Sequence, residues 1–69
     1  MSIHKVIEVL AYSNKGWEDA AQNAVSEAAK TIKNIKSIYI QDQSAKVEKN
    51  KIVEFRITAK ITFKLDRKD

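Results

Sequence analysis

The amino-acid sequence predicts a single α+β domain, spanning residues 1–69, with the element order β-α-β-β. Three observations predict it: a β-branched apolar stretch at residues 3–12, a helical period of apolar residues over 16–33, and two further strand patterns at 36–47 and 51–66. A domain this small buries only about 60% of the surface that its unfolded chain exposes. We therefore expect copies of the chain to associate and complete the core.

The first predicted strand, residues 3–12, is apolar on both faces. Alternation gives one face Ile7, Val9 and Ala11 and the other face Val6, Leu10 and Tyr12. A single helix covers one face of a sheet, so the second face of this strand needs a partner from elsewhere.

The predicted helix follows a polar break at residues 13–16. Glu18 and Asp19 fall in its first turn, where the helix dipole favours negative charge. Its apolar stripe recurs at steps of three and four residues and is mostly alanine. The stripe consists of Trp17, Ala20, Ala21, Ala24, Val25, Ala28, Ala29 and Ile32. Small side chains let the helix lie close to a concave sheet.

The last two strands form a hairpin around a polar turn in which Asn50 is expected to take a positive φ. Residues 36–47 alternate, and Tyr39, Gln41 and Gln43 fall on the face opposite Ile38. Residues 51–66 alternate without a fault from Val53 to Leu65. This strand spans roughly 45 Å at ~3.3 Å per residue, whereas the helix spans about 26 Å. We expect its uncovered ends to contact neighbouring subunits.

Several function classes lack the residues that they need. The chain has no cysteine, and His4 has no nucleophile partner, so we expect no catalytic set and no zinc site. The lone Gly16 cannot form a phosphate loop. The thirteen basic residues are interleaved with nine acidic ones, which is typical of a solvated surface and not of a nucleic-acid interface. No run approaches the ~18 apolar residues of a membrane span, and charges interrupt the first apolar run, so a cytoplasmic location without membrane contact is expected.

The candidate binding residues are polar side chains on the last two strands. Arg56 stands in a row of donors on the polar face of the last strand, where a guanidinium can hold a carboxylate or phosphate through two hydrogen bonds. Asp42 lies in a polar cluster with Gln41 and Gln43, and Tyr39 is a further supporting polar candidate on the same strand. Calcium requires six to eight oxygen ligands, so a calcium site at Asp42 needs several subunits. The metal, if any, is unknown from the sequence.

Three segments together resemble the dodecin family over nearly the whole chain. They are KVIEVLAYS near the start, SNKGWEDAAQNAVSEAAKTIKNI across the helix, and KIVEFRITAKITFKLD in the last strand. The resemblance implies a three-stranded antiparallel sheet that partly wraps one helix. It also implies a hollow homododecamer that binds, stores or sequesters flavin (FMN, riboflavin or FAD) without enzymatic turnover.

The resemblance also implies two ligand-contacting positions, and both are substituted here. The family's flavin-stacking tryptophan on the second strand aligns with Ser37, and the glutamine that hydrogen-bonds the flavin edge aligns with Arg56. Serine has no ring to stack, and arginine donates hydrogen bonds but cannot accept them. The sequence is similar to a branch of the family that lacks flavin and has been associated with calcium. A flavin-free structural or calcium-binding assembly is therefore the alternative prediction.

Overall fold

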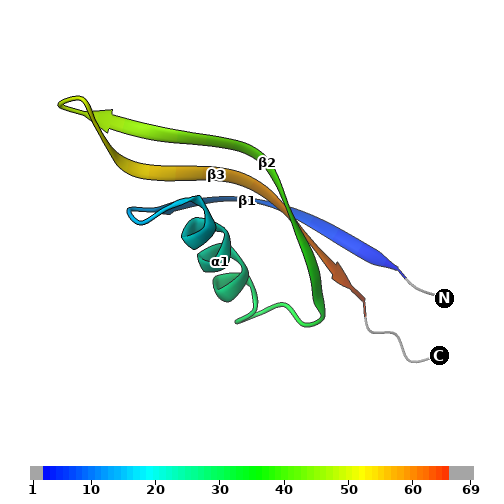
Figure 1. Ribbon diagram of the computed structural model, residues 1–69. Coiled ribbons are helices and arrows are strands. Elements are labelled where there is room, and N and C mark those ends of the chain that lie inside the picture. The colour runs from blue at the N-terminus through cyan, green and yellow to red at the C-terminus, as the bar shows by residue number, and fades with distance from the viewer. Residues whose placement is uncertain (1–2, 66–69) are drawn as a thin grey trace.

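The computed structural model describes residues 3–65 and confirms the predicted β-α-β-β order. The elements are β1 (His4–Ser13), α1 (Trp17–Ala28), β2 (Ile35–Glu48) and β3 (Lys51–Lys64). The strands form one antiparallel sheet in the order β1-β3-β2, and α1 lies on one face of it (Figure 1). The predicted last strand runs to Asp66, which lies outside the described residues.

The helix α1 is shorter than its apolar pattern predicts, because its last turn tightens. It ends at Ala28, whereas the pattern continues to residue 33. Beyond it, the Lys30 N–H donates to the Glu27 carbonyl at 3.2 Å, an i to i−3 bond of 3₁₀ type. Asn34 then takes φ 65, a left-handed conformation that turns the chain towards β2. Within residues 3–65, no helix has the length and apolar character needed to cross a membrane.

The core lies where α1 crosses the middle of the sheet. Ala20 of α1 and Ala59 and Ile61 of β3 are 0% exposed, and Ile57 is 2% exposed. Alanine on both the helix and the sheet permits this close approach. Phe63, further along β3, and Leu65, just beyond its end, remain half-buried. This agrees with the expectation that one helix cannot cover the whole strand.

A buried serine fixes the turn between β1 and α1. The Ser13 hydroxyl donates to the Asp19 carboxylate at 2.6 Å and accepts the Lys15 N–H at 2.9 Å. The Gly16 N–H also points to this hydroxyl, at 3.4 Å. Asp19 is thereby held in the first turn of α1, where the helix dipole stabilises its charge. Ser13 thus links the end of β1 to the first turn of α1.

An irregularity in β2 reverses the side on which two candidate residues lie. The register with β3 shifts between Ile40 and Asp42, so that Asp42 pairs with Thr58 and Gln43 pairs with Ile57. An extra residue in one strand moves the following side chains to the opposite face. The prediction that Gln43 shares the face of Tyr39 is therefore wrong: Gln43 lies on the helix side and Asp42 on the other side.

The end of the β2–β3 hairpin extends beyond the other elements. We call residues 46–54 the hairpin arm; the pairing of β1 with β3 stops at Phe55, before the arm begins. Figure 1 shows the arm projecting past α1. Its turn has positive φ at Lys49 (52) and Asn50 (67), the pattern of a type I′ turn, and the expectation for Asn50 is confirmed.

Candidate ligand face

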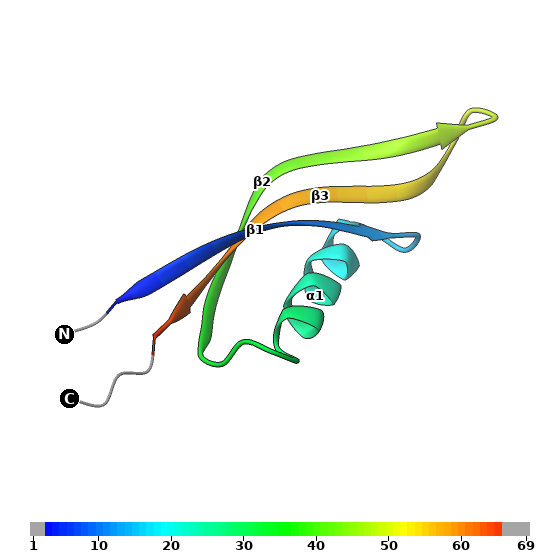
Figure 2. The same ribbon diagram turned by 180° about the vertical axis from the view of Figure 1, so that it is seen from behind.

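The sheet has one face that no element of the same chain covers. Figures 1 and 2 show α1 on one side of the sheet and none of the described elements on the other, which we call the outer face. Its large apolar side chains are well exposed: Leu10 is 67%, Tyr39 64%, Val6 56% and Tyr12 55% exposed. The predicted second apolar face of β1 is therefore present and uncovered. So large an apolar area marks an interaction surface.

Arg56 lies on this outer face in contact with Tyr12 and Glu54. The register pairs Arg56 with Tyr12 of β1 and with Ser44 of β2. Its guanidinium carbon lies 5.8 Å from the centre of the Tyr12 ring, within the range of a cation–π contact. Its Nε donates to Glu54 Oε1 at 2.9 Å, which is its one hydrogen bond within residues 3–65. The two terminal nitrogens are therefore available to an acceptor from another molecule.

Ser37 lies on the same face but far from Arg56. It is exposed and pairs with Thr62, whereas Arg56 lies six residues earlier on β3. At ~3.3 Å per residue, this separation is roughly 20 Å along the strand. A single small ring cannot touch both positions of one chain. One ligand meets both only if two copies of the chain contribute one residue each.

The other sequence-predicted residues divide between the two sides of the sheet. Tyr39 pairs with Lys60 on the outer face, next to the row that contains Asp42. Gln43 lies on the helix side, and His4 is exposed near the start of β1, opposite Lys64. The structure thus places Tyr39 and Asp42 on one face of the sheet and Gln43 on the other. Sequence reasoning missed the contact between Tyr12 and Arg56, since it depends on strand register, which alternation alone does not give.

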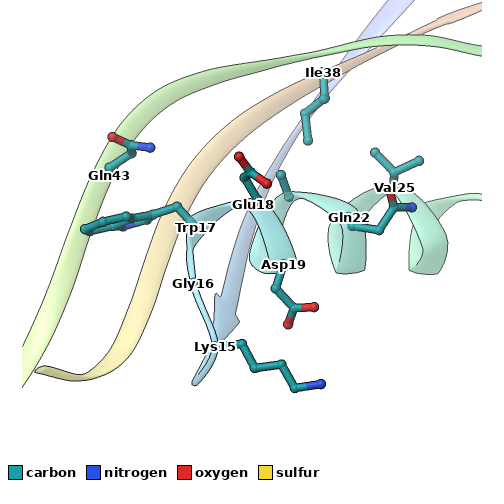
Figure 3. Close-up of a pocket in the computed structure, with 10 residues that line it drawn as sticks. Lys15, Gly16, Trp17, Glu18, Asp19, Gln22, Val25, Ile38 and Gln43 are labelled. Carbon is teal, nitrogen blue, oxygen red and sulfur yellow. The ribbon is translucent and has the colours of Figure 1, made fainter.

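The helix side of the sheet has a groove, which we call the α1–β2 groove. Its volume is about 940 Å³, and it is lined by Trp17, Val25 and other α1 residues on one wall and by Ile38 and Gln43 of β2 on the other (Figure 3). Trp17 closes one end: its ring meets the Phe55 ring edge-on at 4.8 Å, and its indole N–H donates to the Ser44 carbonyl at 3.0 Å. The expected packing role of Trp17 agrees with these contacts.

The described residues of one chain do not gather a metal site. Among residues 3–65, no group of three or more His, Asp or Glu side chains lies close enough to hold an ion. Asp42 is a single carboxylate on the outer face. A hard cation there would require oxygen ligands from other copies.

A three-stranded antiparallel sheet with one helix on one face and an exposed, partly apolar opposite face is typical of a binding or assembly module. Comparison with known proteins gives its family. The family model described as Dodecin matches residues 3–66, so the chain belongs to the dodecin family. A curated relative, calcium dodecin from Mycobacterium tuberculosis (strain ATCC 25618 / H37Rv), is 31% identical over 65 residues, covering 94% of this chain and 92% of the relative.

Solved structures agree with the fold. Dodecin from Streptomyces coelicolor superimposes with a TM-score of 0.89 at 22% identity, covering 97% of this chain and 96% of the other. The calcium-chelating antigen calcium dodecin from Mycobacterium tuberculosis, described with a novel calcium-binding site, superimposes with a TM-score of 0.79 at 27% identity, covering 97% and 96%. The sheet partly wrapped around one helix is thus the fold of this family.

Proposed function

We propose that the chain is a non-enzymatic, self-assembling protein that holds a small planar ligand between copies at the outer face. The observation that carries this proposal is the position of Ser37 and Arg56. Both positions that the resemblance assigns to ligand contact lie on the uncovered face, roughly 20 Å apart along the strand at ~3.3 Å per residue. A site made from both positions requires at least two copies, and the exposed Leu10, Tyr12 and Tyr39 give those copies an apolar surface to share.

The ligand should carry an acceptor group. Arg56 donates hydrogen bonds and accepts none, and the Tyr12 ring beneath its guanidinium helps to orient it. A carboxylate or phosphate matches the guanidinium with two parallel hydrogen bonds. Every flavin has hydrogen-bond acceptors on its ring, but only the phosphorylated flavins, FMN and FAD, also carry a phosphate that can match the guanidinium in this way. Storage or sequestration of an anionic, ring-containing molecule is therefore the function that the outer face supports best.

Native mass spectrometry of the protein as purified tests both parts of this proposal. We expect a homo-oligomer, with twelve copies as the family's number, and a retained mass matching a small ligand. A monomeric mass at micromolar concentration would contradict the proposal.

In a parallel titration, FMN should bind more tightly than riboflavin, and Arg56→Gln should abolish the difference. Lys60→Gln is the matched control on the same strand and face, and should keep it.

Calcium binding is the second candidate, because the 31% identical relative is named for calcium. The described part of one chain offers no cluster of carboxylates, so ligands such as Asp42 would have to converge from several copies. Calcium bound at such an interface would stabilise the assembly by mass action. Thermal unfolding should then shift to lower temperature in chelator and return when calcium is restored. An unchanged unfolding curve would remove the ion from the proposal.

A further inference from the structure

Near the hairpin arm, the outer face carries apolar and polar side chains on adjacent strands. Leu10 and Tyr12 of β1 are exposed on this face. The register places Tyr12 opposite Arg56 of β3, and it places Leu10 opposite Thr58. Neighbouring strands lie about 4.8 Å apart, so an apolar strip on β1 runs alongside two hydrogen-bond donors on β3. We call these four residues the β1–β3 patch.

Two contacts hold Arg56 within the β1–β3 patch. Its Nε donates to Glu54 Oε1 at 2.9 Å, and its guanidinium carbon lies 5.8 Å from the centre of the Tyr12 ring. Its terminal nitrogens have no hydrogen-bond partner within residues 3–65. The side chain is 43% exposed, so an acceptor from another molecule can reach these nitrogens. Arg56 is therefore held on one edge and open on the other.

The described part of the outer face has two well-exposed aromatic side chains, and Tyr12 is the one that lies beside Arg56. The other, Tyr39, pairs with Lys60, which is four residues from Arg56 along β3. That separation is about 13 Å at ~3.3 Å per residue. The distance of 5.8 Å between the guanidinium carbon and the Tyr12 ring is much shorter. One small molecule can therefore touch Tyr12 and Arg56 of the same chain at once.

From these observations, we infer that Tyr12 recognises the ring of the bound ligand while Arg56 holds an acidic group of the same molecule. The ring lies against the exposed part of the Tyr12 ring, and Leu10 extends this apolar surface along β1. A carboxylate or phosphate matches the free terminal nitrogens of Arg56. The ligand class is thus an aromatic or heteroaromatic anion. This assignment rests on the function proposed above and adds the side chain that selects for the ring.

Substitutions of Tyr12, tested with two ligands, separate contact with the ring from orientation of Arg56. FMN carries a ring and a phosphate, whereas ribose 5-phosphate, measured by displacement of FMN, carries the phosphate without the ring. Tyr12→Leu should raise the Kd for FMN about fivefold more than the Kd for ribose 5-phosphate, because one stacking contact is lost. Tyr12→Phe keeps the ring and should bind FMN as the wild type does. An equal rise for both ligands would mean that Tyr12 only orients Arg56, and would overturn the inference.

Two further variants keep the inference testable where Tyr12→Leu disturbs assembly. Tyr12→Trp enlarges the ring and should lower the Kd for FMN relative to that for ribose 5-phosphate, a gain that misfolding cannot produce. Tyr39→Leu removes the other exposed ring and should change this ratio less than Tyr12→Leu does; a larger change would place the ring contact at Tyr39 and overturn the inference. A wild-type chain that is monomeric or binds no FMN would overturn the proposed function and the inference with it. Wild-type binding that no Tyr12 variant alters would overturn the inference alone.

Discussion

Restoring the two family residues should convert the outer face into a tight flavin site. In the variant Ser37→Trp/Arg56→Gln, position 37 gains a ring for stacking and position 56 gains an amide that both donates and accepts. Ser37 is exposed on the edge strand β2, so an indole there fits without displacing a core side chain. Tryptophan also has a high strand propensity. We therefore expect the variant to fold and assemble as the wild-type chain does.

The expected gain follows from the contacts that the variant adds. Ring stacking contributes about 1 kcal/mol per pair, and the hydrogen bond that the amide accepts, which arginine cannot make, contributes about 1 kcal/mol. A total of about 2 kcal/mol corresponds to roughly a thirtyfold lower Kd. Titration of riboflavin with protein, followed by quenching of flavin fluorescence, measures this change. Riboflavin is chosen because it lacks a phosphate, so any gain comes from the ring.

The control variant is Ser44→Trp/Arg56→Gln, which adds the same two side chains. Ser44 is also exposed and also lies on the outer face of β2, where it pairs with position 56 itself. An indole there lies beside the glutamine of its own chain, instead of near the end of the sheet. The reasoning is refuted if the Ser37→Trp variant fails to bind riboflavin more tightly than wild type, or if the control gains as much.

Two further predictions concern the stability of the turns that hold these surfaces. Replacing Lys49→Asn and Asn50→Gly puts residues that tolerate positive φ at both centres of the type I′ turn, and should raise the unfolding free energy by about 1 kcal/mol. A lower melting temperature would contradict that reading of the turn. Ser13→Ala removes a buried hydroxyl that bonds Asp19 and the Lys15 N–H, and should lower the unfolding free energy by about 1–2 kcal/mol in urea titrations at fixed protein concentration. Ser26→Ala, an exposed serine on α1, should change it little; equal effects would mean that the Ser13 network has no special role.

The fold was predictable because its signals are periodic and local. The alternation along β3 and the alanine stripe of α1 each identify an element without knowledge of the others. The sequence predicted only that part of β3 would be buried, because the expected helix is shorter than the expected strand. It did not predict which part. The structure then locates the covered part at Ile57, Ala59 and Ile61, beneath the centre of α1.

The candidate site was less predictable because it depends on relations between strands. The contact of Arg56 with Tyr12 follows from the register of β1 against β3, which alternation does not encode. The faces of Asp42 and Gln43 were reversed by the irregularity at Gln41, and an irregular position leaves no clear signal in one sequence. The helix end at Ala28 was missed because the apolar pattern continues past it, while the backbone must tighten to reach β2.

The irregularities of β2 also bear on how the protein avoids aggregation. Both β1 and β2 lie at edges of the sheet, where unpaired backbone groups can recruit strands from other molecules into fibres. Two extra residues, Lys36 and Gln41, interrupt β2, so its outward backbone groups do not form one continuous row. Lys36 and Lys46 add charge along the same edge. Open-ended addition of further sheets along the β2 edge is thereby disfavoured. Copies of the chain are left to associate through other surfaces, where a closed assembly of a finite number of copies can form.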